Sequence, residues 1–468
     1  MRTYKRFCVY QINKKYPLLV INNVLPGTWL SSYFSRAKSV ELIAVDFSGK
    51  GVTMGSYIGD AAFNEIYEDV FSKFSIDESK IIMIGHSNGG YATWAQAQMT
   101  PDRYSAIFSS VSEPNKELLL NLSNMSVRYF TSESDYLDLI VTNTVEEIRE
   151  QIKDYKTYRI EKFNHSLMGT VQFNEKILNE LIQSSRDEFP NEVYFSTNKN
   201  RYLKAYWIRI HSMKSGNLLA KIHANIERNH IFITAENITG ITVTIPPQVD
   251  KKNGELTING EVFPIAGNDK IILVEQDGRF IFSDTEQIGE IYLGTGLIDP
   301  FITPVKIVSF LGEDKTKIVN NYRSPETNGF YGGISVHYPI LDVSLLKSFP
   351  DQSLIVFDNC TDYGEIIDII REATIIKTNI SGYSYQDKQY SGDYLVMQIV
   401  THPTNSKSSI LYINTNNEEL YNKCLFTRKL ILPAYANGRH PYLNSDAVIF
   451  DGRRYFVVSE YGLDITEC

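Results

Sequence analysis

Residues 80–99 combine a strand pattern, a glycine-framed pentapeptide and a helix pattern without interruption. Residues 80–85 (KIIMIG) are apolar on both faces, which is typical of a strand in a parallel sheet covered on both sides. The pentapeptide at residues 85–89 (GHSNG) follows, and residues 90–99 have a helical pattern. Small residues two positions before and after Ser87 allow the strand and the helix to approach closely. The segment therefore predicts a strand, a sharp turn that carries Ser87, and a helix.

The first 190 residues alternate between strand and helix patterns. The expected strands cover residues 17–22, 41–46, 80–85, 106–111, 127–131 and 158–163. The expected helices cover residues 61–74, 90–99, 145–155 and 170–183. This alternation predicts an α/β fold, a doubly wound and mostly parallel sheet with helices on both faces.

The pattern changes after residue 190, and 468 residues exceed the length of about 250–300 at which single cores stop growing. Residues 191–265 carry short alternating apolar runs separated by turn residues, which predict an antiparallel β module. Residues 266–468 mix strand patterns with one helix-like run at 363–373, which predicts a β-rich region with some α/β character. We therefore expect three parts, covering residues 1–190, 191–265 and 266–468.

Composition excludes several classes of partner. The 46 Lys and Arg residues are outnumbered by 55 Asp and Glu, so the net charge is −9 and binding to nucleic acid or to an anionic membrane is not expected. No run of about 18 apolar residues predicts a membrane-spanning helix. Basic residues near the N-terminus precede an apolar stretch, but Lys14, Lys15, Asn22 and Asn23 interrupt that stretch and no small-residue cleavage site follows. We therefore expect no secretory signal and a cytoplasmic location.

Metal and cofactor sites are not expected either. The four cysteines are far apart and form no CxxC pair, which argues against a zinc ribbon or a disulfide scaffold. The histidines of the β module show no ligand spacing; they are His211, His223 and His230. Three carboxylates near residue 360 are interpreted as a solvated loop rather than a metal site; they are Asp358, Asp362 and Glu365.

A serine that acts as a nucleophile needs a base, and the base needs an acid that orients it. His165 is the only histidine after Ser87 within the α/β part, and it follows an expected strand. Asp135 lies 30 residues before His165, in the loop after the strand at 127–131, and Asp138 is the alternative acid. A glycine-rich turn that carries Ser87 without any chemistry is the competing interpretation.

A serine nucleophile also needs two N–H groups that stabilise a negatively charged oxygen. The backbone N–H of Asn88, directly after Ser87, is the first expected donor. The loop at residues 22–27, after the first central strand, should supply the second from Asn23 or Val24.

Residues 45–115 resemble the catalytic domain of prolyl oligopeptidase-like serine hydrolases, which belong to the α/β-hydrolase superfamily. The matching segments are Gly49-Lys50-Gly51, Asp77 to Ile81, Gly85 to Gly90, and Pro101-Asp102-Arg103-Tyr104. The resemblance covers about residues 16–185 and implies Ser87 as nucleophile, Asp135 as acid and His165 as base. Asn88 replaces the Met that the family has after the serine.

Two further features of the resemblance concern the domains that would control access to the site. Residues 204–247 are similar to a β module that follows the hydrolase domain in some bacterial members. We expect no N-terminal propeller, and we expect the C-terminal β region to filter access instead.

The residues are compatible with three functions. The first is a serine hydrolase that cleaves an acyl bond, most readily a peptide, through an acyl-enzyme. The second is an esterase, thioesterase or acyltransferase that uses the same residues. The third is a catalytically silent binding protein that acts through residues 191–468, which are longer than the hydrolase part. The substrate would be a peptide or an ester, no cofactor is implied, and a homo-oligomer remains open.

Overall fold

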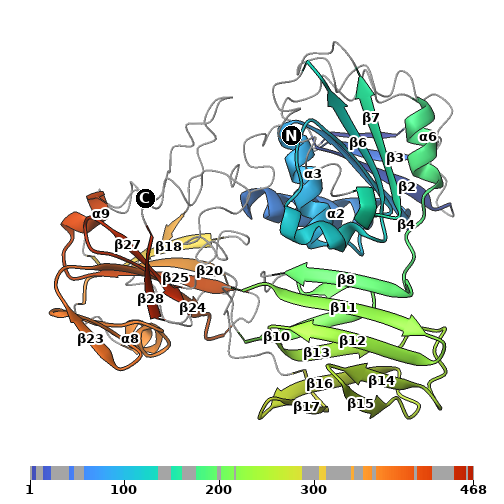
Figure 1. Ribbon diagram of the computed structural model, residues 1–468. Helices are drawn as coiled ribbons and strands as arrows, with labels where there is room; N and C mark the ends of the chain where they lie inside the picture. The colour runs from blue at the N-terminus through green and yellow to red at the C-terminus, as the bar shows by residue number, and fades with distance from the viewer. Residues whose placement is uncertain are drawn as a thin grey trace.

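The structure is a computed structural model and is shown in Figure 1. It describes residues 3–6, 14–22, 42–46, 57–134, 149–160, 175–197, 202–214, 218–286, 305–311, 339–341, 352–360, 365–404, 408–423, 447–459 and 462–466.

A seven-stranded sheet forms the centre of the first unit, with strand order β1-β3-β2-β4-β5-β6-β7. Its strands are β1 (Thr3–Arg6), β2 (Tyr16–Asn22), β3 (Ile43–Asp46), β4 (Ile76–His86), β5 (Ala106–Ser110), β6 (Ser126–Ser132) and β7 (Asp154–Ile160). Only β1 is antiparallel to its neighbour, and the other six strands are parallel. The expected α/β class with a mostly parallel sheet is confirmed.

Helices cover both faces of this sheet (Figure 1). The helical elements are α2 (Tyr57–Lys73), α3 (Asn88–Met99), the 3-10 helix η2 (Lys116–Leu122) and α6 (Glu175–Gln183). Alternate residues of β2 enter different cores: Leu18 packs with residues of α2 and α3, whereas Leu19 packs with residues of α6. Because side chains of a strand alternate between faces, a sheet covered on both sides requires apolar residues at every position.

Three elements of this unit differ from the sequence-based expectation. The sequence pattern predicts neither strand β1 nor the 3-10 helix η2. Strand β7 begins at Asp154, although the residues up to 155 have a helical pattern. Asp154 pairs with Ser126 at the start of β6, and its carboxylate accepts hydrogen bonds from the Ser126 hydroxyl and from buried Arg128. Pairing with β6 along its whole length therefore outweighs the local helical pattern.

Two five-stranded sheets form the second unit, with orders β17-β16-β13-β10-β9 and β15-β14-β12-β11-β8. The strands are β8 (Glu192–Thr197), β9 (Lys204–Ala205), β10 (Ile208–Met213), β11 (Ala220–Glu227), β12 (His230–Glu236), β13 (Ile238–Thr244), β14 (Glu255–Ile258), β15 (Glu261–Pro264), β16 (Lys270–Gln276) and β17 (Arg279–Phe282). Residues of both sheets share one apolar core, as in a β-sandwich. Because β16 pairs with β13, we propose that this unit extends to Phe282.

An eight-stranded mixed sheet forms the third unit, with order β19-β18-β20-β25-β24-β26-β27-β28. Its strands are β18 (Val305–Ser309), β19 (Ile340–Leu341), β20 (Ser353–Asp358), β24 (Leu395–Thr401), β25 (Ser409–Thr415), β26 (Ala447–Phe450), β27 (Tyr455–Ser459) and β28 (Gly462–Thr466). The helices α8 (Glu365–Glu372) and α9 (Glu419–Lys423) accompany it, together with a small sheet of β21 (Lys377–Asn379), β22 (Gly382–Tyr385) and β23 (Lys388–Ser391). None of the described helices is long and apolar enough to cross a membrane.

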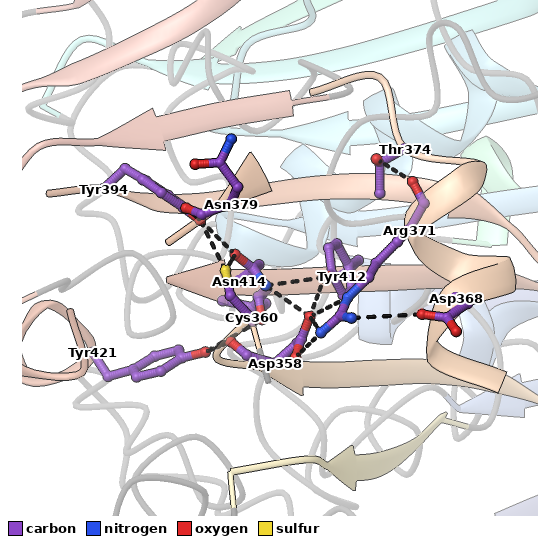
Figure 2. Close-up of polar contacts among 11 residues, drawn as sticks. Asp358, Cys360, Asp368, Arg371, Thr374, Asn379, Tyr394, Tyr412, Asn414 and Tyr421 are labelled. Atoms are coloured by element: carbon purple, nitrogen blue, oxygen red, sulfur yellow. Dashed lines mark hydrogen bonds and ion pairs between the residues drawn. The ribbon is translucent and has the colours of Figure 1, made fainter. Parts of the chain in front are cut away.

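A buried polar cluster surrounds Asp358 at the end of β20, as Figure 2 shows. The Asp358 carboxylate is fully buried and accepts two hydrogen bonds in parallel from Arg371 on α8, at 3.0 and 2.9 Å. It also accepts hydrogen bonds from the Tyr412 hydroxyl and from the Asn414 amide. Burial and the adjacent carboxylate raise the pKa of Tyr412, so its hydroxyl stays a donor. The solvated-loop interpretation of Asp358 was wrong, because a cation and two neutral donors satisfy it in the interior.

Replacing Arg371 by Met should destabilise the third unit by about 3 kcal/mol, because it leaves Asp358 buried without its cation. Urea unfolding of the full chain, followed by circular dichroism, measures the change. Asp368→Asn is the matched control, since Asp368 pairs with Arg371 at 3.6 Å from an exposed position and its loss should cost less than about 1 kcal/mol. Equal shifts for both variants would contradict the account.

Candidate active site

The expected strand–turn–helix at Ser87 is present. Strand β4 ends at His86, helix α3 begins at Asn88, and Ser87 lies between them with φ 53°. A positive φ is uncommon for a residue other than glycine and costs about 1–3 kcal/mol, so the surrounding structure must impose it. The Ser87 N–H donates to the carbonyl oxygen of Ser110 at 2.9 Å, and its own carbonyl accepts from the N–H of Tyr91 at 3.0 Å. These bonds fix the turn to β5 on one side and to α3 on the other.

Two glycines let the strand and helix approach at this turn. A Cβ atom added to Gly85 would lie 2.0 Å from the carbonyl oxygen of Gly89. A Cβ atom added to Gly89 would lie 2.1 Å from the carbonyl oxygen of Asn22, at the end of β2. Neither distance is sterically possible, and backbone atoms cannot move aside as a flexible side chain can. The small residues that frame Ser87 are therefore required by the packing of β2, β4 and α3.

Residues at the end of β5 form hydrogen bonds with residues on either side of Ser87. His86 Nδ1 lies 2.7 Å from the Ser110 hydroxyl, and the Ser112 carbonyl accepts a hydrogen bond from the Trp94 indole N–H at 3.1 Å. Between these two serines, Val111 is fully buried and has φ 53°. A β-branched residue with positive φ is a strained outlier. Sequence analysis did not single out this second strained residue, because valine carries no signal for such a conformation.

Of the remaining expected site residues, the structure describes only Asn88. Asn88 is the first residue of α3, so its N–H belongs to the first turn, where backbone donors have no partner within the helix. The other expected residues lie outside the described part of the chain; they are Asn23, Val24, Asp135, Asp138 and His165.

The strands that precede these residues in the chain end at one edge of the sheet. Asn23 follows β2, which ends at Asn22, and Asp135 follows β6, which ends at Ser132. His165 follows β7, which ends at Ile160. Since β2, β4, β6 and β7 are parallel, their carboxyl ends lie at the edge of the sheet where Ser87 follows β4.

The segment Pro101–Tyr104 of the family resemblance has a structural role. The Arg103 guanidinium lies 4.6 Å from the centre of the Tyr67 ring, and the Tyr67 hydroxyl donates to Tyr104 at 3.0 Å. Burial raises the pKa of both phenols, so they remain neutral. The Pro101 carbonyl accepts from Tyr206 of the sandwich at 3.3 Å. The segment thus joins α2 to the second unit, away from Ser87.

The described residues hold no group of three or more His, Cys, Asp or Glu side chains that could bind a metal ion. Ser87 places its hydroxyl on a strained turn at the carboxyl edge of a parallel sheet, directly before the N-terminus of α3. A strand, a strained serine and a helix in this order are the geometry that a nucleophile turn of the α/β-hydrolase type requires.

A family of known proteins matches part of the first unit. Residues 63–171 match the sequence model of the prolyl oligopeptidase family, as the resemblance implied. The match includes Ser87, strand β4 and helix α3. No curated protein matches the chain.

Several solved structures are similar over part of the chain. A thermostable esterase has 15% identity and a TM-score of 0.34 over 38% of this chain, and the chain spans about half of that protein (56%). Est1E from Butyrivibrio proteoclasticus has 13% identity and a TM-score of 0.28 over 36% of this chain and 89% of its own. An S-formylglutathione hydrolase from Staphylococcus aureus has 13% identity and a TM-score of 0.31, over 37% of this chain and 83% of its own.

Proposed function

We propose that the protein cleaves an acyl bond with Ser87 as nucleophile, His165 as base and Asp135 as the acid that orients His165. The observation that carries the proposal is the conformation of Ser87. Ser87 has a positive φ and lies between a buried parallel strand and a helix N-terminus. The neighbouring positions 85 and 89 must be glycine, because a Cβ atom at either would collide with the backbone. Ser87 combines φ 53° with ψ −120°, outside the left-handed helical region that turn residues commonly adopt, and strain of this kind gathers at functional sites.

The reaction proceeds in two acyl transfers. The Ser87 hydroxyl oxygen attacks the carbonyl carbon while His165 accepts the hydroxyl proton, and the backbone N–H of Asn88 and of Asn23 or Val24 stabilise the negative carbonyl oxygen. His165 then donates the proton to the leaving amine or alcohol, and the acyl-enzyme forms. Water, deprotonated by His165, attacks the acyl-enzyme and releases the acid and free Ser87.

We propose a peptide as the substrate, because the matched family domain is that of prolyl oligopeptidases. An ester or thioester requires the same residues and is the alternative. The test compares kcat/KM of the full chain for peptide p-nitroanilides and for p-nitrophenyl esters of short acids. Peptide anilides turned over at rates comparable to the activated esters support a peptidase, since an anilide is intrinsically far less reactive. Ester turnover alone selects the esterase, and no turnover of either selects the silent binding protein.

The identity of the triad acid gives a separate prediction. Asp135→Asn should lower kcat by about 10²–10⁴-fold, because an amide favours the wrong tautomer of the histidine. Asp138→Asn is the matched control, with the same change three residues along the same loop, and it should leave kcat within about threefold. Steady-state kinetics on the best substrate of the panel measures both. The opposite ranking would assign the acid to Asp138.

A further inference from the structure

Asn22 is the last residue of β2, and the chain leaves the sheet there toward Asn23 and Val24. Its side chain is buried, with 3% of its surface exposed. The Asn22 amide nitrogen donates to the hydroxyl of Thr93 at 2.9 Å, and this hydroxyl donates to the Gly89 carbonyl oxygen at 2.8 Å. Thr93 lies one turn into α3, and Gly89 lies in the first turn of that helix. A relay of two hydrogen bonds therefore joins the end of β2 to the helix that follows Ser87.

The backbone repeats this connection. Asn22 pairs with Gly85 in the parallel register of β2 and β4, and the Asn22 carbonyl lies directly against the Cα of Gly89. Thr93 also packs against Gly85, because a Cβ atom on Gly85 would lie 2.5 Å from the hydroxyl oxygen of Thr93. Asn22 and Thr93 thus hold together the two glycines that frame Ser87.

Stability alone is a poor explanation for an amide at this position. Asn22 Oδ1 is buried and has no hydrogen-bond partner among the described residues. An unsatisfied buried acceptor costs about 1–3 kcal/mol, whereas the hydrogen bond to Thr93 contributes about 1 kcal/mol. An apolar side chain of the same shape would avoid the unsatisfied oxygen, so the amide is better explained by what it positions.

We infer that Asn22, acting through Thr93, is a positioning residue for the two N–H groups of the oxyanion hole. The inference rests on the proposed function. One donor, the N–H of Asn88, belongs to the first turn of α3, and the other, from Asn23 or Val24, comes one or two residues after Asn22 in the chain. The Asn22–Thr93 bond ties the last residue of β2, which precedes one proposed donor in the chain, to α3, which carries the other. Donors must lie within about 0.5 Å of their productive positions, and an error of 1 Å costs about 10²-fold in rate.

The test uses Thr93→Val, which removes the hydroxyl and keeps the shape, and Thr93→Ser, which keeps the hydroxyl. Asn22→Leu removes the amide from the other end. We expect Thr93→Val and Asn22→Leu each to lower kcat and kcat/KM by about 10–100-fold, equally, because the interaction acts only on the transition state. Thr93→Ser should stay within about threefold of the wild type. The double variant should be no slower than the slower single variant, since both changes break one relay.

A merely structural role would lower the thermal midpoint and leave kcat of the folded protein unchanged, so both are measured on each variant. Unchanged kcat in Thr93→Val would overturn the inference even if Asn22→Leu does not fold. Independent losses that multiply in the double variant would also overturn it. Ser87→Ala separates this failure from failure of the proposed function. If Ser87→Ala is inactive while Thr93→Val is fully active, only the positioning role is wrong.

Discussion

Replacing Ser87 by Ala should lower kcat by about 10⁴–10⁶-fold while the protein stays folded. Without the hydroxyl no acyl-enzyme forms, and only substrate binding and the oxyanion donors remain to accelerate the reaction. The change leaves the turn intact, because the hydrogen bonds that fix residue 87 come from its backbone N–H and carbonyl. The measurement is kcat on the best substrate, with the thermal midpoint recorded in parallel.

Two controls accompany this prediction. Ser72→Ala removes a hydroxyl from an exposed position on α2, where it bonds only to the preceding turn, and should leave kcat unchanged. Ser87→Gly should be as inactive as Ser87→Ala but slightly more stable, since glycine adopts positive φ without strain. Full turnover by Ser87→Ala would assign the chemistry to another residue.

Gly89→Ala should cost more than about 4 kcal/mol or prevent the first unit from folding. The new methyl group would lie 2.1 Å from the Asn22 carbonyl oxygen, so β2 and α3 would have to separate. Because this separation also moves the oxyanion donors, any folded fraction should be inactive. Urea unfolding and kcat measure the two effects.

Gly260→Ala is the matched control for this substitution. Gly260 has φ 89° in a turn of the sandwich, and a Cβ atom there would meet no atom within 4 Å. The change should therefore cost only the backbone strain of about 1–2 kcal/mol and leave kcat unaltered. A Gly89→Ala protein with wild-type stability and activity would show that the close approach at Ser87 is not required.

The parts of the fold that are coded locally could be predicted from the sequence. Residues 80–99 carry their strand, turn and helix signals next to one another, and the structure contains all three elements. The start of strand β7 could not be predicted locally. Asp154 and Tyr155 continue a helical sequence pattern and form a strand only because they pair with β6.

Contacts between distant residues explain the other differences. Asp358 resembles a loop carboxylate until Arg371 and Tyr412 bury it from a helix and from a neighbouring strand. The Asn22–Thr93 bond joins residues 71 positions apart, and neither residue stands out in the sequence. The sequence also gives no sign of the positive φ of Val111, because the packing of β5 and β6 imposes this conformation. The reacting groups can therefore be proposed from the sequence, whereas the contacts that fix the turn at Ser87 are seen only in the structure.

The most direct test of the account is labelling with a fluorophosphonate probe, which phosphonylates an activated serine and leaves other serines unmodified. The adduct is located by mass spectrometry of proteolytic fragments of the wild-type chain and of the Ser87→Ala variant. We predict one adduct on Ser87 in the wild type and none in the variant. A folded wild-type chain that is not labelled, or one labelled equally after Ser87→Ala, would contradict the assignment of Ser87 as the nucleophile.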